Sequence, residues 1–228
     1  NVEVRQVNIG FKVAGRIMLN NPEWRGTVTG FGDKVRGWLL QPQGESLMYL
    51  AIFMDAHAVA GKAQLLAEVR QRVMQLATDN DALVARFAMA IDAFGGAAGW
   101  WNRLLSLGGD ADLVNLKKAG IFPIVHGVRS LALARRIKAT GTVERIAALQ
   151  GEGQLDEAMA QELVQGLHFL MGLRLQAGLA ELELQRPVTG NVDPQRLSSL
   201  ERDLLKDTLS AVKRFKALLH QRLRLDAV

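Results

Sequence analysis

The sequence predicts a mainly α protein that is built as an antiparallel helical bundle. Several segments place apolar residues three and four positions apart, which is the pattern of an amphipathic helix with one buried face. Short connections join these segments, and short connections favour antiparallel neighbours. The 228 residues are 49% hydrophobic, which is enough for a substantial core and excludes a disordered chain.

The N-terminal part carries both strand and helix signals. Residues Asn1–Asn21 begin with β-branched residues and contain spaced glycines, so we expect a strand or two with loops. Apolar residues then follow helical spacing from Trp24 to Leu40. The apolar run Met48–Met54 is either a buried strand or part of a helix, because its periodicity cannot decide between them.

Helical patterns dominate after Gly61. An amphipathic helix is predicted from Lys62 to Leu76. Thr78 with Asp81 resembles a capping box, which begins a second helix. The bulky cluster around Trp100 and its neighbours is interpreted as core rather than as a base-stacking platform.

The C-terminal part of the sequence predicts three further helices. A short helix is predicted over Thr142–Leu149 with Thr142 as its cap, and a long one from about Asp156 to Leu184. Asp193 followed by Pro194 is a helix-start signal, because Asp caps free N–H groups and Pro needs none at a first helical position. The last helix carries a leucine-rich stripe.

Composition excludes several classes of protein. The absence of cysteine excludes disulfides and thiolate metal sites and fits a reducing, cytoplasmic compartment. No apolar run is long enough for a membrane span, and the first residues lack the apolar core of a signal peptide. The chain does not begin with Met, so we expect it to be part of a longer protein. A net charge of +5 and a pI near 9.8 permit an anionic partner, but no aromatic–basic nucleic-acid module is present.

The stretch from Leu116 to Arg136 combines features that suggest an anion site. Lys117 and Lys118 end a short apolar run, and a turn at Gly120 and a helix start at Pro123 are predicted after them. Free N–H groups at such a helix start attract phosphate or carboxylate, and nearby lysines add to that attraction. The alternative is a loop-to-helix corner with solvated lysines.

Two arginines fall on helix faces that should be buried. Arg129 has apolar neighbours three and four positions away, and Arg174 continues the stripe of Leu163, Leu167 and Leu170. A buried arginine needs a partner, so each should meet a carboxylate or line a polar cavity. The alternative for each is a structural ion pair. Lys206, by contrast, lies on a face that looks solvated.

Asp55 and His57 follow the apolar run Met48–Met54. A carboxylate at the end of a buried strand is a common place for a metal ligand, and the alternative is a turn residue. The other histidines show no ligand spacing. The sequence contains no Walker loop, Rossmann fingerprint, nucleophile elbow or HExxH motif.

Six motifs occur in a fixed order along the chain. They are Ile17–Gly26 (IMLNNPEWRG), Ile52–Lys62 (IFMDAHAVAGK), Leu116–Leu133 (LKKAGIFPIVHGVRSLAL), Thr142–Ile146 (TVERI), Phe169–Gln176 (FLMGLRLQ) and Asp193–Leu209 (DPQRLSSLERDLLKDTL). This order resembles the C-terminal half of bacterial nucleotidyltransferases that follow CBS or cyclic-nucleotide-binding domains in signalling proteins, which are relatives of the PII uridylyltransferases. The resemblance covers nearly the whole chain.

The resemblance implies two domains. Residues 1–70 would be the C-terminal end of a nucleotidyltransferase domain, a small α+β remnant, and residues 71–228 a helical nucleotidyltransferase substrate-binding domain. The family's Gly-Ser loop and paired aspartates have no match here, and His57 and Lys62 replace its usual basic and acidic residues. Metal-assisted transfer needs two or more carboxylates, so this chain is not expected to transfer nucleotides on its own.

The resemblance also implies roles for residues and partners. Asp55 is the candidate catalytic residue, and Lys118, Arg129, Arg174 and Lys206 are expected to contact nucleotide phosphates or an acidic acceptor. Mg²⁺ and a nucleoside triphosphate are expected for the full-length protein, with no metal or cofactor held by this chain. Expected partners are a PII-like or other acidic protein, the upstream catalytic and CBS or cyclic-nucleotide-binding domains, and a second copy in a homodimer.

Two other functions compete with this one. The chain could be a non-catalytic helical module for regulation or dimerisation, in which the inward arginines form only structural ion pairs. Nucleic-acid binding is a third hypothesis, which the high pI suggests and which predicts a steep salt dependence of affinity.

Overall fold

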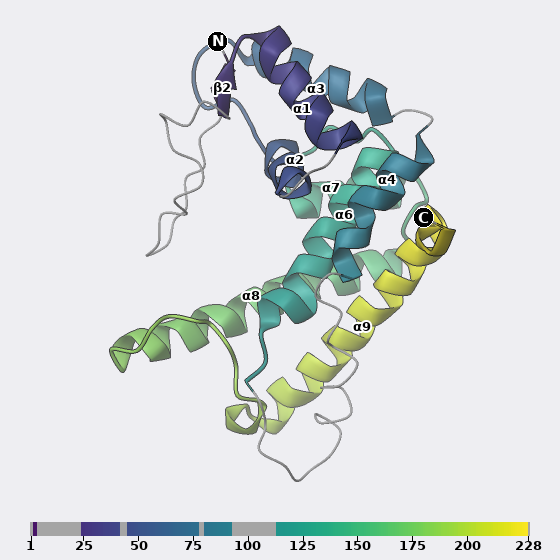
Figure 1. The fold of residues 1–228 in the computed structure, drawn as a ribbon. Helices are drawn as coiled ribbons and strands as arrows, with labels where there is room; N and C mark the ends of the chain where they lie inside the picture. The colour runs from purple at the N-terminus through teal and green to yellow at the C-terminus, as the bar shows by residue number, and fades with distance from the viewer. Residues whose placement is uncertain (1, 4–23, 42–44, 78–79, 93–112, 228) are drawn as a thin grey trace.

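The computed structural model describes residues 2–3, 24–41, 45–77, 80–92 and 113–227. These residues are mainly helical and confirm the predicted bundle (Figure 1). Two short strands, β1 (Val2–Glu3) and β2 (Arg25–Gly26), pair antiparallel. The rest of the N-terminal stretch predicted as strand, and the cluster around Trp100, lie outside the described residues.

Three helices form the N-terminal unit: α1 (Val28–Leu40), α2 (Ser46–Met54) and α3 (Ala63–Ala77). The side chain of Thr27 accepts a 3.1 Å hydrogen bond from the N–H of Gly30 and so caps α1. The apolar run for which strand and helix were both open is helical and makes up most of α2. An aromatic cluster holds the unit together. Its members are Trp24, Phe31, Trp38, Tyr49 and Phe53.

Helix α4 (Asp81–Ala88) continues into the 3₁₀ turn η2 (Met89–Asp92). It contributes side chains to two hydrophobic cores, one in the N-terminal unit and one in the C-terminal bundle. Its cap is Asn80, whose side chain accepts a 3.1 Å hydrogen bond from the N–H of Leu83. The predicted cap, Thr78, lies outside the described residues. Leu83, Val84 and Phe87 pack into the N-terminal core, whereas Ala85 and Ala88 pack into the C-terminal one.

The predicted turn at Gly120 is wrong. Lys117–Ile121 form a π-helical segment, η3, that runs directly into α6 (Phe122–Ala134). The wide turn, in which the N–H of Phe122 donates to the carbonyl of Lys117, accommodates Pro123, which has no N–H to donate. Gly120 instead allows α8 to pack closely against η3, since a Cβ at this position would lie 2.4 Å from Leu170 Cδ1. The helix start that was expected to attract an anion at Pro123 is therefore absent.

The remaining helices are α7 (Thr142–Gly151), α8 (Glu157–Glu183) and α9 (Ser199–Leu223). Asp156 caps α8 through a 2.7 Å hydrogen bond from the N–H of Met159. The cap of α7 is Gly141 rather than Thr142.

The signal at Asp193 and Pro194 begins only a short 3₁₀ turn, η4 (Pro194–Arg196). Helix α9 begins after it, with a reciprocal capping box between Ser198 and Glu201. A final 3₁₀ turn, η5 (Leu225–Ala227), follows α9.

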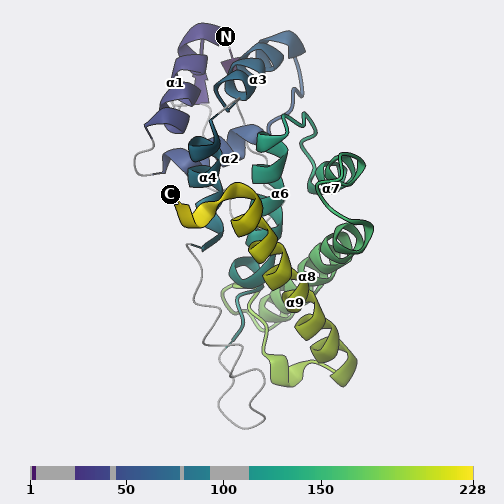
Figure 2. The same ribbon diagram turned by 90° about the vertical axis from the view of Figure 1, so that its right-hand side faces the viewer.

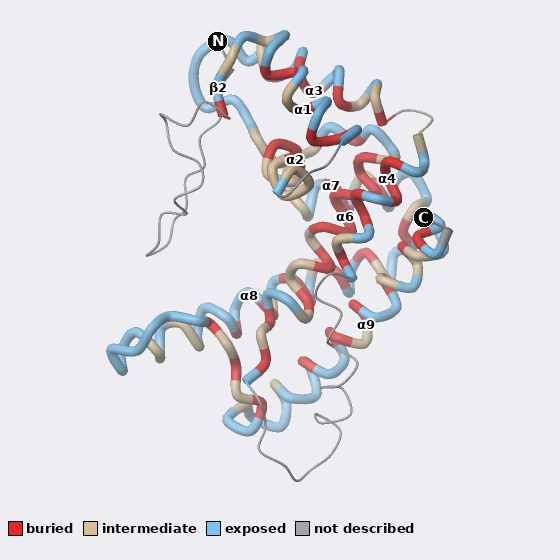
Figure 3. The backbone as a smooth tube through the Cα atoms, in the orientation of Figure 1, coloured by how far each residue is buried: buried red, intermediate tan, exposed pale blue. Residues whose placement is uncertain are grey.

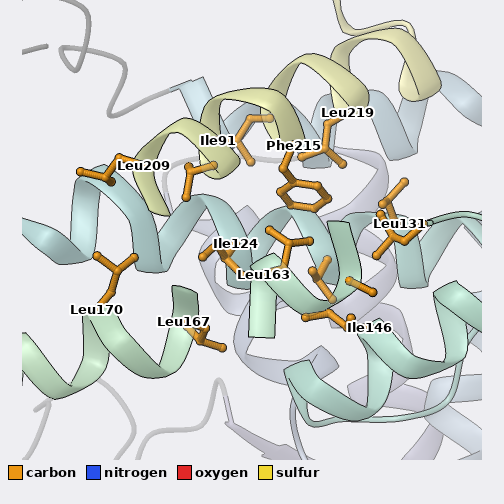
Figure 4. Close-up of a cluster of buried hydrophobic side chains, with 14 of the residues drawn as sticks. Ile91, Ile124, Leu131, Ile146, Leu163, Leu167, Leu170, Leu209, Phe215 and Leu219 are labelled. Atoms are coloured by element: carbon orange, nitrogen blue, oxygen red, sulfur yellow. The ribbon is translucent and has the colours of Figure 1, made fainter. Parts of the chain in front are cut away.

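Helix α6 is the centre of the C-terminal core. It packs against α4, α7 and α9, and η3 packs against α8 and α9 (Figure 2). Glycine allows α6 to approach α9 closely, because a Cβ at Gly127 would lie 2.7 Å from the ring of Phe215. Figure 4 shows this core. Its labelled members are Ile91, Ile124, Leu131, Ile146, Leu163, Leu167, Leu170, Leu209, Phe215 and Leu219.

The C-terminal half of α8 projects from the bundle as an arm (Figures 1 and 3). Burial on α8 ends at Leu173, after which the helix is exposed or half-buried on every side. Among the described helices, none is long and apolar enough to cross a membrane.

Candidate functional site

The most concentrated charge cluster in the described structure is centred on Asp55. Its Oδ1 accepts hydrogen bonds from Nε of Arg129 at 3.1 Å and from Nη1 of Arg145 at 2.6 Å. Its Oδ2 accepts from Nη2 of Arg129. The carboxylate therefore holds two guanidinium groups at once, and one of them, Arg145, is only 1% exposed.

This cluster joins elements that are far apart in the sequence. Asp55 is the C-terminal cap of α2, whereas Arg129 lies on α6 and Arg145 on α7. The carbonyl of Met54 accepts two more hydrogen bonds, from Nη2 of Arg145 at 2.8 Å and from Nη2 of Arg70 on α3 at 3.1 Å. The cluster thus connects the N-terminal unit to the C-terminal bundle.

Two of these guanidinium groups, those of Arg129 and Arg145, keep Asp55 ionised. Burial raises the pKa of this carboxyl, but hydrogen bonds and the charges of Arg129 and Arg145 outweigh burial and hold the pKa below its usual value. Burial lowers the pKa of both Arg145 and Arg70. Arginines nevertheless stay protonated at neutral pH, so three positive charges surround one negative charge.

His126 lies next to this cluster and is neutral. Burial, and then the charge of Arg129, lower its pKa to about 4. Nη1 of Arg129 lies 3.2 Å from Nδ1, and the carbonyl of Phe87 lies 2.7 Å from Nε2. Because arginine can only donate, Nδ1 accepts and Nε2 carries the proton that it donates to Phe87.

The surroundings of Asp55 do not fit a divalent cation. Both carboxylate oxygens already accept hydrogen bonds from guanidinium groups, whose charges repel a metal ion. Among the residues that the structure describes, no three acidic, histidine or cysteine side chains are grouped to hold a metal. Asp55 in this arrangement is therefore unsuited to hold Mg²⁺, and its catalytic role stays a prediction.

The structure separates Arg129 from the other predicted substrate-binding residues. Arg129 is buried and meets a carboxylate, as expected for an arginine on an apolar face. Lys118, Arg174 and Lys206 are exposed on η3, α8 and α9. Lys206 therefore lies on a solvated face, as the sequence indicates.

The prediction that Arg174 faces the core is wrong. The stripe of buried leucines on α8 ends as the helix leaves the bundle, so one further turn reaches solvent. The side chain of Arg174 instead lies over the backbone of Gly190, where a Cβ would be 2.8 Å from its Cγ.

Three contacts bring the segments that carry Lys118, Arg174 and Lys206 to one end of the bundle. Gly120 packs against Leu170 of α8 and Leu209 of α9. Lys118 lies two residues before Gly120. Arg174 lies one helical turn after Leu170, and Lys206 lies one helical turn before Leu209. A backbone bridge from Val114 to Val192 ties the start of η3 to the segment beneath Arg174. We call this set of three cations the basic end.

Sequence reasoning missed Arg145, Arg70 and His126. Arg145 carried the same signal as Arg129, because it lies beside Ile146 and one turn before Leu149 on the apolar face of its helix. Arg70 and His126 gave weaker signals, since a lone cation or histidine on an amphipathic helix is ordinarily at its solvated edge.

Comparisons with known proteins give one match. Residues 81–223 match the family model described as "putative nucleotidyltransferase substrate binding domain". This segment begins with α4 and ends with α9, and it contains Arg129, Arg145 and the whole basic end, but not Asp55. A search of curated proteins and a search of solved structures find no match.

Proposed function

From the premise that the chain belongs to the nucleotidyltransferase substrate-binding domain family, we propose that it holds the anionic part of the substrate in a nucleotidyl transfer reaction. The nucleotidyl group would pass from a nucleoside triphosphate to a protein or small acceptor. The motif order favours a parent enzyme similar to the PII uridylyltransferases, with CBS or cyclic-nucleotide-binding domains upstream.

The observation that carries this proposal is the basic end. Lys118, Arg174 and Lys206 come from three separate elements that meet around Gly120. Cations on elements that meet can present several donors to one ligand, which suits phosphate or carboxylate groups. The substrate's phosphates or an acidic acceptor would bind there, while Arg129 is already committed to Asp55.

The proposal assigns the reaction chemistry to another part of the protein. Nucleotidyl transfer uses metal ions held by several carboxylates, and Asp55 is a single carboxylate surrounded by arginines. An upstream catalytic portion would supply the metal site and hold Mg²⁺ with the triphosphate. The cluster around Asp55 would fix the position of the substrate-binding bundle relative to that portion.

Calorimetric titration of the chain with ATP and with UTP tests the proposal. We expect one nucleotide to bind, and we expect Arg174→Ala and Lys206→Ala each to weaken binding about tenfold, the effect of one lost charged hydrogen bond. Lys138→Ala is the matched control, because Lys138 is an exposed lysine in the connection between α6 and α7. Absence of binding, together with unaltered activity of the full-length enzyme after Arg174→Ala, would sink the proposal.

The alternative is a helical module for regulation or dimerisation. The specific observation in its favour is the exposed apolar surface on α8, where Met171, Leu175, Leu179 and Leu182 are solvent-accessible. A module of this kind predicts self-association without nucleotide binding. The titration therefore separates the two functions. A flat dependence of any nucleic-acid affinity on salt would remove the third hypothesis.

A further inference from the structure

The arm of α8 carries a row of exposed apolar side chains. Met171 is 52% and Leu175 63% exposed, and Leu179 and Leu182 are also exposed. At about 100° per residue these four side chains fall within one narrow arc of the helix. Exposed apolar side chains that line up on one face indicate an interaction surface, whereas scattered ones do not.

The same face of α8 continues into a groove within the bundle. A cavity of about 220 Å³ lies between α7 and α8, and its lining includes Val143, Ala147, Ala160 and Val164. Ala160 and Val164 fall in the same arc as the apolar residues of the arm. From Ala160 to Leu182 this face extends over about 33 Å. Ala160, Gln161 and Val164 line the cavity in its first half, and large apolar side chains protrude from its second half.

We propose that a second copy of this chain covers this face in a two-fold symmetric dimer. The two α8 helices would run antiparallel, and the two-fold axis would pass between Met171 and Gly172. The arm of each copy would then lie in the groove between α7 and α8 of the other. The facing pairs across the axis would be Gln161 with Leu182, Val164 with Leu179, His168 with Leu175, and Met171 with Gly172.

The distribution of side-chain sizes favours a second copy as the occupant. A two-fold interface uses the same surface on both subunits, so the protruding arm must meet a complementary surface on an identical chain. The pairing places Leu179 over Val164 and Leu182 over Gln161, both of which line the cavity, and Leu175 over His168. Gly172 at the axis has open space where a Cβ would be, so the two helices can approach closely.

The placement of the arm also suits this arrangement. It extends away from the rest of the bundle and diverges from α9 (Figure 1). The loop after α8 packs along one edge of this face, where Val188 lies against Gly178, and Glu181 accepts hydrogen bonds from Thr189 and Gly190. Met171, Leu175, Leu179 and Leu182 remain exposed beside this loop.

Sedimentation velocity over a range of protein concentrations tests the proposal. We expect a dimer, and we expect Leu175→Glu on the arm and Ala147→Glu in the groove each to weaken dimerisation at least tenfold. Leu200→Glu is the matched control, because Leu200 is 76% exposed on α9 and lies outside this face. Circular dichroism and thermal unfolding of each variant establish that it is folded.

Single cysteines report the geometry directly, because the natural sequence contains none. Met171→Cys should form a covalent dimer on mild oxidation, and a mixture of Val164→Cys with Leu179→Cys should give a mixed dimer. Leu200→Cys should stay monomeric under reducing-gel analysis of the same reaction. A wild-type chain that is monomeric at every soluble concentration overturns the proposal. So does a dimer that is unaffected by Leu175→Glu or Ala147→Glu, or one that Leu200→Cys links as well as Met171→Cys.

Discussion

Asp55 and Arg145, ninety positions apart in the sequence, are joined by a 2.6 Å hydrogen bond between Oδ1 and Nη1. Arg145 also donates from Nη2 to the carbonyl of Met54 and from Nε to the carbonyl of Ala139, so each of its three nitrogens has an acceptor. Such complete pairing of a buried cation offsets the loss of its hydration. It makes Asp55 the anion on which the junction between α2, α6 and α7 depends.

Replacement of Asp55 by Asn should destabilise the fold strongly. The change removes the negative charge that compensates Arg129 and Arg145 and leaves both cations in a poorly hydrated place. We expect a loss of roughly 3 kcal/mol in the free energy of unfolding, at the low end for a broken buried pair because the side chain of Asp55 is 38% exposed. Urea unfolding at neutral pH measures this change.

The control for Asp55→Asn is Glu152→Gln, which removes the acidic partner of Arg135 in an exposed ion pair. That change should alter the free energy of unfolding by less than about 1 kcal/mol, because exposed ion pairs are well screened. Equal effects of the two substitutions would show that Asp55 is an ordinary surface carboxylate.

Arg145→Lys should be as harmful as loss of the charge, although it keeps the charge. A lysine ammonium cannot reach the acceptors on Asp55, Met54 and Ala139 together from the position of a planar guanidinium. We expect a loss of roughly 3 kcal/mol in unfolding free energy. Arg135→Lys, at an exposed pair, should be nearly neutral. A fully stable Arg145→Lys would mean that only the charge matters.

The helices could be predicted from the sequence because their signals are local. The periodicity of α3, α8 and α9 and the Asp156 cap are set by residues within a few positions of one another. The same locality explains the failure at Gly120. A glycine among these neighbours in the sequence indicates a turn. In the structure it leaves room for the side chains of Leu170 and Leu209, which come from other helices.

The candidate site could be predicted only in part. An arginine on an apolar face requires a partner, which predicted either a carboxylate or a polar cavity for Arg129, and the structure has a carboxylate. Which carboxylate it would be depends on how α2 packs against α6, and no local pattern encodes that. The predicted burial of Arg174 was wrong for a related reason. Its apolar stripe is continuous in the sequence, but α8 extends beyond the end of the bundle.

Gly127→Ala should destabilise the contact between α6 and α9. The new Cβ would lie 2.5 Å from Leu219 Cδ1 and 2.7 Å from the ring of Phe215, whose side chain is fully buried. Overpacking of this kind costs about 1–3 kcal/mol. Gly37→Ala in α1 is the matched control, because its Cβ meets nothing within 4 Å and alanine is the better helix former. Thermal unfolding should therefore shift in opposite directions for the two variants.

Lowering the pH from 6.5 to 4 should destabilise the protein, because His126 is neutral in the folded state. The folded state lowers the pKa of His126 from 6.5 to about 4, so between these values the unfolded chain binds a proton that the folded chain does not. Stability that is present above pH 6.5 is therefore lost as the pH falls towards 4, by about 3 kcal/mol. Asp55, whose pKa is also lowered, adds a further loss below its ordinary value of 3.8. His126→Gln can still donate to Phe87 but cannot titrate, so its unfolding free energy, measured in urea, should vary less between pH 7 and pH 4. Parallel pH profiles for the two proteins would contradict the assignment of a neutral, buried His126.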